Sequence, residues 1–429
     1  MTASIAFGGI MRRPFLIIFI ILLIVSFIYT NINTINPDCI NEDIEVTGIV
    51  RYKKEKERYN EYTVGKFVVR DYTKHKTMKV GSEIKLTGEF KDLNKMSYES
   101  FDYGRYLRSV GYKGLIYLKD YSTLGNNLMY EYIYKVKSYI SNTIRYLYKT
   151  NSDFINSIML GQKDDLSQNE KLMFTRTGTS HIIAISGFHT GILSGVIIFI
   201  MGKINKIYKL VSLSIIMFLY STMVGNSPSI IRSIIFMILL YLSFFLDRKI
   251  DKISTLSFVG ILFVINNPYI IYNVSFQLSF LATLSIIYFY DYINNKLNIK
   301  IISLTLSANI LTIPIIYYNF KGIPLASIFS NIIIVPFVGI IIYLAMLSLI
   351  LFKINIYISN IVVYINRFIL ETIYILLEKI SNLDFAYIIV EEPKLYYVII
   401  YYTVVFLYMI YKEAKMIKEQ SHELQGYYK

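Results

Sequence analysis

Apolar residues occur in long runs along most of the chain, and short polar turns separate these runs. The runs lie near residues 15–29, 181–201, 210–224, 230–246, 253–267, 271–290, 301–318, 323–352, 356–378 and 395–411. A helix needs about 20 predominantly apolar residues, with a range of roughly 17–25, to cross a bilayer. The pattern therefore predicts about ten transmembrane helices, several of them short or tilted.

The stretch from about residue 38 to 122 has a different pattern. Ile84, Leu86 and Phe90 fall in one phase between mostly charged neighbours, which is typical of a half-buried strand. Further strands are expected at 44–50, 64–69 and 113–118, with a short helix near 98–110 before the last strand. About five short strands with one helix suit a small barrel such as an OB-fold.

The predicted fold is an all-α polytopic membrane protein with an inserted small OB-like β-barrel. The expected parts are an N-terminal transmembrane helix (1–34), the OB-like domain (35–125), amphipathic connecting helices on or near the membrane surface (126–180), a polytopic channel domain (181–415) and a tail (416–429). The first run follows Arg12, Arg13 and Pro14 as in a signal peptide, but no small-residue cleavage site follows it. We therefore expect this helix to be retained.

Basic residues alternate along the chain as the positive-inside rule requires. The turns expected inside contain Lys203, Lys206 and Lys209; Arg248, Lys249 and Lys252; Lys296 and Lys300; Lys353; and Lys412, Lys415 and Lys418. The turns at 225–228 and 266–268 contain no Lys or Arg. This pattern predicts a multi-pass protein of the cytoplasmic membrane with both termini cytoplasmic and the barrel extracellular.

Composition agrees with a membrane location and excludes several kinds of site. The chain is 54% hydrophobic and only 17% charged, and its net charge of +14 is expected to be mainly an orientation signal. The single cysteine, Cys39, excludes an intrachain disulfide and a cysteine-rich metal site. The sequence contains no P-loop and no His/Asp cluster at metal-ligand spacing. We expect no cofactor and no metal.

Aromatic and basic residues are interleaved in the barrel sequence, as in proteins on which bases stack while cations pair with phosphates. The DNA-binding candidates are Tyr52, Lys53, Lys54, Arg58, Lys66, Phe67 and Arg70. The alternative, which carries equal weight, is a solvated sheet in a Tyr-rich protein.

The membrane part contains a polar block from His181 to His189. Gly187, Gly191 and Gly195 recur every four residues, which predicts a stripe where another helix approaches closely. A histidine within the membrane usually faces a cavity or a polar partner. Ser186 and His189 also suggest a serine hydrolase, but a pair at i, i+3 on one helix seldom has the required geometry, so no catalytic residue is expected.

Two further features point to a polar route. Arg232 lies about one turn into an apolar run, where it either extends to the surface or faces a wet lumen. Pro314, Pro324 and Pro336 interrupt two consecutive apolar runs. Interrupted backbone at membrane depth requires protein or water to satisfy it, and transport pathways use such breaks. A proline kink packed against neighbouring helices is the alternative reading.

These residues resemble those of the ComEC family of competence proteins, which are DNA-internalisation channels. The blocks that resemble the family are 161–170 with Phe174, Gly178, His181 and 185–189; 225–232; 267–268 with 275–280; 331–336; and 101–107 with Gly111 in the barrel. They cover nearly all of the chain in the family's order. Many members carry a C-terminal metallo-β-lactamase-like domain, and we expect this chain to lack it because it ends shortly after Tyr411.

The resemblance implies uptake of single-stranded DNA across the cytoplasmic membrane during natural transformation, without enzymatic activity. It places His181, Ser186, Gly187, His189, Arg232, Gln277, Asn331 and Pro336 at the channel helix or along the transport path. The implied partners are single-stranded DNA, the lipid bilayer, a surface DNA receptor, a cytoplasmic ATPase or single-strand-binding protein, and a separate nuclease. The alternatives are a small-solute or glycan transporter, which requires a closed ligand-sized pocket, and an intramembrane hydrolase that uses Ser186.

Overall fold

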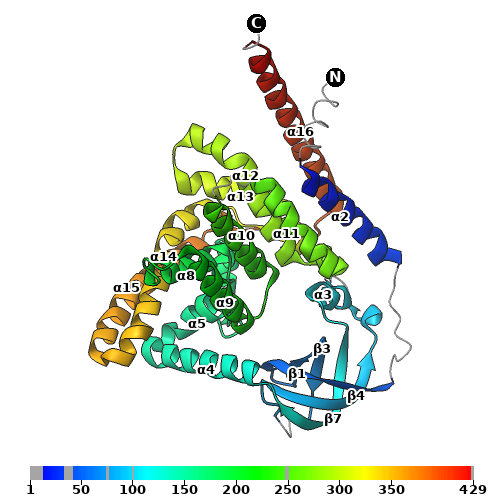
Figure 1. Cartoon of the computed structure of the whole chain (residues 1–429), viewed down its shortest axis with the longest axis vertical. Helices are drawn as coiled ribbons and strands as arrows, with labels where there is room; N and C mark the ends of the chain where they lie inside the picture. Colours follow the sequence, from blue (N-terminus) through cyan, green and yellow to red (C-terminus); the bar gives the residue numbers. More distant parts are fainter. Residues whose placement is uncertain (1–12, 33–41, 74–76, 99–100, 247–250, 427–429) are drawn as a thin grey trace.

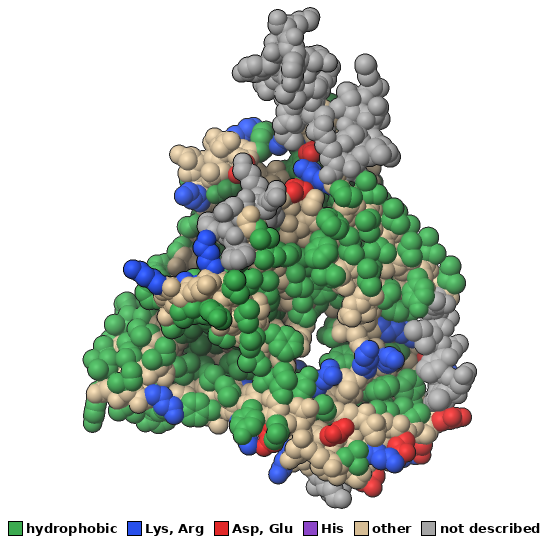
Figure 2. Space-filling view, viewed as in Figure 1, with side chains coloured by type: hydrophobic (Ala, Val, Ile, Leu, Met, Phe, Trp, Pro, Cys, Tyr) green, Lys and Arg blue, Asp and Glu red, His purple; other side chains and the backbone are tan. Residues whose placement is uncertain are grey.

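The computed structural model describes residues 13–32, 42–73, 77–98, 101–246 and 251–426. A β-barrel lies at one end of the molecule and the two termini lie near the other, with the helices between them (Figure 1). The helical part presents mostly hydrophobic side chains on the face that Figure 2 shows, whereas acidic side chains gather mainly on the barrel. This distribution agrees with a helical region in lipid and a barrel in water.

The barrel is closed and has the strand order β1-β2-β3-β7-β4. Its strands are β1 (Asp43–Glu55), β2 (Asn60–Val64), β3 (Phe67–Asp71), β4 (Ser82–Lys91) and β7 (Gly114–Asn126). β3 and β7 pair in parallel, whereas the other neighbouring strands that pair are antiparallel. Ile84, Leu86 and Phe90 on β4 are buried, as the alternation predicts. The predicted small OB-like barrel is therefore confirmed.

Two local expectations for the barrel were inexact. The run 64–69 is not one strand, because Gly65 and Lys66 form a two-residue turn between β2 and β3. Gly65 has φ +57, a conformation that glycine adopts without strain. The helix before β7, α3 (Tyr103–Val110), is shorter than expected, and a small hairpin of β5 (Ser97–Tyr98) and β6 (Phe101–Asp102) precedes it.

Helices occupy all ten apolar runs, although the run 181–201 is not the single helix that was predicted, because residues 184–186 interrupt it. Seven are long and apolar enough to cross a membrane: α2 (Pro14–Ile32), α9 (Lys206–Val224), α12 (Val274–Leu297), α13 (Lys300–Phe320), α14 (Ser327–Ile354), α15 (Ile356–Ser381) and α16 (Leu395–Gly426), which meets these criteria over its first 21 residues. Three are shorter: α8 (Gly187–Ile200), α10 (Pro228–Phe245) and α11 (Lys252–Asn266). α2 is part of the packed structure, since Phe19 fills the space where Gly260 of α11 has no side chain.

The connecting helices belong to the core of the helical region. They are α4 (Leu128–Tyr148), α5 (Ser152–Leu160), α6 (Gln168–Arg176) and the one-turn α7 (Ser180–Ile183). Ile144, Phe154 and Phe174 share one buried cluster with Val338 of α14 and Leu370 of α15. The connecting helices therefore pack directly against helices that follow residue 180.

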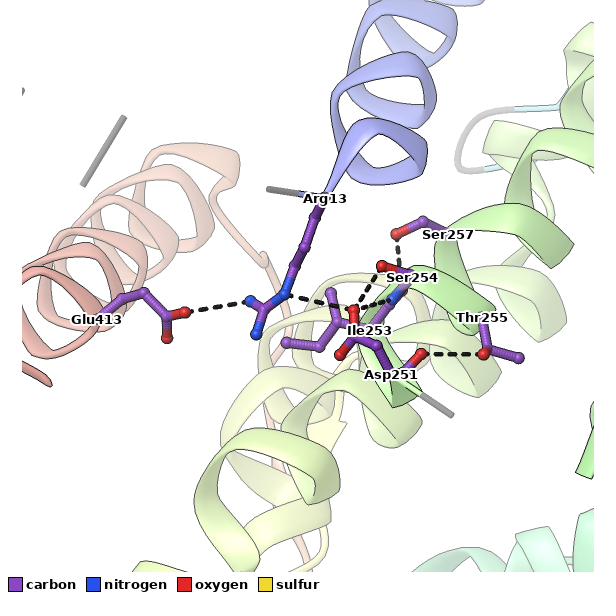
Figure 3. Close-up of polar contacts among 7 residues, drawn as sticks. All are labelled: Arg13, Asp251, Ile253, Ser254, Thr255, Ser257 and Glu413. Atoms are coloured by element: carbon purple, nitrogen blue, oxygen red, sulfur yellow. Dashed lines mark hydrogen bonds and ion pairs between the residues drawn. The ribbon is translucent and has the colours of Figure 1, made fainter. Parts of the chain in front are cut away.

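Several residues that the charge pattern places inside meet at one face. Arg13 pairs with Asp251 (3.4 Å) at the start of α11 and with Glu413 (3.2 Å) of α16, as Figure 3 shows. Lys412 lies over the ring of Tyr292, and so does Lys296. Arg248 and Lys249 lie outside the described residues, and so does the side chain of Lys418.

Lys353 does not join this face. Its amine lies 4.7 Å from the ring centroid of Tyr139 on α4. Two residues earlier, Lys137 donates a hydrogen bond to the carbonyl of Met223 (2.9 Å) near the end of α9. The α14–α15 turn thus packs beside α4, away from the termini (Figure 1). Lys353 therefore lies apart from Arg13, Lys296 and Lys412, and the side of the membrane on which it lies stays a prediction.

Candidate functional site

A cleft of about 1710 Å³ separates the barrel from the helical region. Its walls come from β1, the β2–β3 turn, α3, α4 and the loop 161–165, and the ends of α9 and α11 line it on the side of the helical region. Figure 2 shows an opening between the barrel and the helices, with Lys and Arg side chains at its edge. The cleft therefore lies where a ligand would pass between the two parts.

Cations outnumber carboxylates in the cleft. The lining residues include nine cations, which are Arg51, Lys53, Lys54, Lys66, Arg108, Lys113, Lys137, Arg145 and Lys163, and three carboxylates, which are Glu55, Asp164 and Asp165. Aromatic rings also line it: Tyr52, Phe67, Phe90, Tyr106, Tyr112, Tyr130, Tyr134 and Tyr269. Clustered cations attract a polyanion, and flat rings accept stacked bases.

The barrel candidates separate into two groups. Tyr52, Lys53, Lys54, Lys66 and Phe67 line the cleft. The two candidate arginines are not among its lining residues.

Arg70 is held by the barrel itself. It pairs with Glu61 (3.2 Å), donates a hydrogen bond to the Tyr103 hydroxyl (2.8 Å) and lies over the rings of Tyr59 and Tyr103. Arg58 is exposed between β1 and β2. The guanidinium of Arg70 is therefore held by Glu61, Tyr59 and Tyr103 within the barrel. Arg58, in contrast, is accessible to solvent.

Burial changes the proton affinity of two groups in the cleft. Burial, together with nearby Asp164 and Asp165, raises the pKa of Tyr52 to about 12, so its phenol stays neutral. Burial lowers the pKa of Lys137 to about 8. α4, which carries Lys137, is not among the apolar spanning helices. The charge of Lys137 therefore depends on pH near the physiological range.

Sequence reasoning missed the contribution of α4. Lys137, Ser141 and Arg145 all line the cleft and are spaced by four residues. That spacing places them on one helical face. The periodic signal was present in the sequence, but only the position of α4 beside the barrel shows that this face meets the cleft.

Beneath the cleft the chain breaks between α7 and α8. Gly161, in the cleft, lies against Val224 and Ile185, and Ile185 directly precedes Ser186. Ser186 caps α8 with extended backbone, and its N–H donates to His189 Nδ1 (3.2 Å). The floor of the cleft thus adjoins the start of α8.

Ser186 and His189 do contact each other, contrary to expectation, with Oγ 3.1 Å from Nδ1. The same Nδ1 accepts the backbone N–H, so the neutral ring carries its proton on Nε2. Nε2 is buried and has no hydrogen-bond partner among the described residues. The imidazole therefore acts here as a helix cap, and no carboxylate in the described part of the chain bonds to it as in a catalytic triad.

Arg232 lies beside the start of α8. Its Nε donates to Ser279 Oγ (2.8 Å), and a Cβ added to Gly187 would lie 2.9 Å from Ser233 Oγ and 3.9 Å from an Arg232 guanidinium nitrogen. The predicted glycine stripe approaches a helix this closely only at its first position. A Cβ at Gly191 would meet open space, and one at Gly195 would lie 3.9 Å from the Tyr343 hydroxyl.

The remaining predicted path residues have separate environments. His181 is exposed on α7. Gln277 donates to the carbonyl of Ile271 (2.7 Å). Asn331 donates to Thr305 (3.4 Å), and its Oδ1 is buried without a partner among the described residues. Pro336 lies inside α14. The structure thus brings Ser186, Gly187, His189 and Arg232 together, with His181 close enough to His189 for the two rings to interact electrostatically, but Gln277, Asn331 and Pro336 lie elsewhere.

A search of the described residues finds no group of three or more His, Cys, Asp or Glu side chains that could hold a metal ion. The groups available for binding in the cleft and at the start of α8 are mainly cations, aromatic rings and neutral polar side chains.

Comparison with known proteins supports a family assignment. The chain is 23% identical to "ComE operon protein 3" of Bacillus subtilis (strain 168) over 265 residues, which is 60% of this chain and 34% of that protein. It is 29% identical to an uncharacterized protein of Aquifex aeolicus over 126 residues, 29% of this chain and 30% of that protein. The matches thus span about a third of each relative's length. No solved structure matches. The model of the family described as "Competence protein" matches residues 158–415, so this membrane protein belongs to the competence protein family.

Proposed function

We propose that this protein is a channel through which single-stranded DNA crosses the cytoplasmic membrane, with the barrel outside and both termini inside. The observation that carries the proposal is the cleft, whose nine cations suit a phosphate backbone and whose exposed rings, such as Tyr52, Tyr106 and Tyr134, suit unpaired bases. Membership of the competence family and the similarity to "ComE operon protein 3" support this direction.

The proposed route runs from the cleft past Gly161 and Ile185 to the start of α8. There the guanidinium of Arg232 and the proton on His189 Nε2 offer donors to a phosphate. The N-terminus of α8 adds the positive end of a helix dipole. A fixed cation and a helix N-terminus lower the cost of moving an anion through hydrocarbon.

The size of the cleft favours a strand over a small solute. Pockets for small ligands are usually about 300–1,000 Å³ and enclose their ligand. The volume here, about 1710 Å³, exceeds that range, and the cleft opens to the surface (Figure 2). A closed, ligand-sized pocket was the requirement for a solute or glycan transporter.

Binding to the full-length protein in detergent tests the proposal directly. The probe is a fluorescent oligothymidylate, and anisotropy is measured across a salt series. The variant Lys66→Ala/Lys113→Ala removes two cations of the cleft. We expect weaker binding and a log–log salt slope smaller by about 1.4, because each lost phosphate contact with a single strand reduces the slope by about 0.7. The matched control is Lys85→Ala/Lys119→Ala, whose lysines pair with Glu45 and Asp43 outside the cleft.

Uptake in cells tests the transport step. A strain without this gene is complemented with the wild type, with His189→Ala or with Arg232→Ala, and labelled DNA reaching the cytoplasm is measured at matched protein levels. We expect the wild type to restore uptake and both variants to fail. Unchanged uptake without the gene would reject the DNA-channel function. Labelling of Ser186 by a serine-reactive probe would instead support a hydrolase.

A further inference from the structure

The loop 161–167 places two aspartates in the cationic cleft, and each pairs with a cation from a different wall. Asp164 Oδ2 lies 2.7 Å from Lys54 Nζ of β1. Asp165 Oδ2 lies 3.0 Å from an Arg145 guanidinium nitrogen of α4. The loop thus connects the barrel wall and the helix wall through two neighbouring carboxylates.

These ion pairs are open to exchange. The side chains are 30% and 46% exposed for Lys54 and Asp164, and 51% and 37% exposed for Arg145 and Asp165. Ion pairs that remain in contact with water are weak and are screened by salt. A competing anion can therefore replace either carboxylate without leaving a buried charge unpaired.

The backbone of the loop is anchored along its length, since the carbonyl of Asp164 accepts a hydrogen bond from Lys171 Nζ (2.9 Å) and Leu166 is buried. Gly161 has φ +71. A Cβ added to Gly161 would lie 3.1 Å from the carbonyl oxygen of Val224, so the backbone is closely packed there. Gln162 accepts a hydrogen bond from Ser141 (3.0 Å), and Ser167 forms a capping box with Glu170 at the start of α6. The loop therefore has firm anchors on both sides of Asp164 and Asp165.

We propose that Asp164 and Asp165 are internal counter-anions that hold the empty cleft together and that a phosphate backbone displaces them. This inference rests on the proposed function. Two adjacent carboxylates occupy two cations on opposite walls, much as successive phosphates of a strand would. A polyanion replaces both contacts at once, whereas a monovalent solute anion replaces one and leaves the other in place. Asp164 and Asp165 together therefore favour the binding of polyanions over the binding of single anions in the cleft.

The first experiment removes the two negative charges. Oligothymidylate binding to the full-length protein at low salt is compared between the wild type and Asp164→Asn/Asp165→Asn. We expect the variant to bind more tightly by about threefold or more, the size expected from releasing two exposed ion pairs. The control Asp43→Asn/Asp120→Asn makes the same change in net charge on the barrel outside the cleft lining.

The second experiment holds the loop in place. Lys54→Cys and Asp164→Cys are combined on a Cys39→Ser background and joined by a reducible bifunctional methanethiosulfonate reagent. We expect the link to block strand binding and uptake and reduction to restore both to the level of the unlinked double variant, while the same reagent leaves each single-cysteine variant at its own untreated level of binding. This test applies even where the Asn variant fails to fold.

The outcomes separate the two proposals. Tighter binding by the Asn variant together with a block by the link supports the counter-anion. If the wild type binds the oligonucleotide but the Asn variant matches the Asp43→Asn/Asp120→Asn control and the link has no effect, the counter-anion is rejected and the channel stands. If the wild type does not bind at low salt, the channel proposal fails and this inference fails with it.

Discussion

At Gly187 the start of α8 lies close against α10. A side chain there would lie 2.9 Å from Ser233 Oγ, close to the guanidinium of Arg232. The absence of a Cβ thus lets the start of α8 lie beside the cation that we place on the route. Close helix packing therefore explains why a glycine occupies position 187, and this explanation does not require catalysis.

We predict that Gly187→Ala destabilises the protein by about 1–3 kcal/mol, the usual cost of overpacking, and lowers DNA uptake. Gly191→Ala is the matched control because a Cβ at Gly191 meets open space. The measurements are the thermal unfolding midpoint in detergent and uptake in the complemented strain. Equal effects of the two substitutions would contradict the packing argument.

Lys137 gives the cleft a pH dependence. Burial lowers its pKa to about 8, below its ordinary value, so the amine is charged below pH 8 and loses its charge above it. A bound phosphate favours the charged form, so binding above pH 8 requires uptake of a proton. In the unfolded chain the amine has its ordinary pKa of 10.5, so the cost of the buried charge to stability develops as the pH falls from about 10.5 to about 8 and is fully present below pH 8.

We predict that oligonucleotide affinity falls by up to about tenfold between pH 7 and pH 9, since one pKa unit corresponds to about 1.4 kcal/mol. Lys137→Arg keeps its charge over this range and should flatten the profile. Anisotropy titrations at constant ionic strength measure both proteins. A wild-type profile as flat as that of the variant would show that Lys137 does not contribute to binding.

At the scale of elements, the link between α6 and α7 is fitted tightly against α14. Gly178 has φ +70, and a Cβ there would lie 2.6 Å from Ser327 Cβ and 2.9 Å from Pro324 Cβ. This contact holds the segment that leads to Ser186 against the start of α14. The proline-interrupted runs thus serve at least partly as a packing surface, which was the alternative reading of those prolines.

We predict that Gly178→Ala loses uptake and costs about 1–3 kcal/mol more than Gly202→Ala. Both glycines have positive φ, so the backbone strain is similar, but Gly202 lies in open space. Comparison of their unfolding midpoints isolates the contact with α14. A Gly202→Ala variant as damaged as Gly178→Ala would assign the effect to backbone strain alone.

At the scale of the whole molecule, the charged residues distinguish two ends. Arg13, Asp251 and Glu413 meet near the termini, whereas Asn267 donates to the carbonyl of Arg108 (2.8 Å) and so connects the other end of α11 to the barrel. Lys353 lies beside Tyr139 of α4. A simple alternation of basic turns would place it with Arg13 near the termini instead.

We predict that Lys353→Cys is labelled by a membrane-impermeant maleimide applied from outside, because its position beside α4 lies on the barrel side of the protein. Lys412→Cys should react only after the membrane is permeabilised. Both variants carry Cys39→Ser to remove the native thiol, and Asp120→Cys on the barrel is the positive control. If the maleimide applied from outside does not label Lys353→Cys, position 353 lies inside, as the simple alternation of basic turns predicts.

The sequence by itself determined the elements and their environment. Apolar runs of membrane length become helices because lipid offers no partner for backbone polar groups. The period-2 burial of Ile84, Leu86 and Phe90 follows from the strand geometry alone. The break before α8 was not predicted, because the apolar run 181–201 favours one helix, and only the structure shows that Ser186 and His189 satisfy the exposed backbone there.

Only the tertiary structure decided which distant residues share a site. Lys54, Arg145 and Asp164 belong to three elements, and no local pattern relates their positions in space. The same limit explains why Arg70, a candidate from its neighbours, turned out to be paired with Glu61 within the barrel. Periodicity is a property of one element, whereas a cleft results from the packing of several, so its lining depends on contacts that the sequence order does not specify.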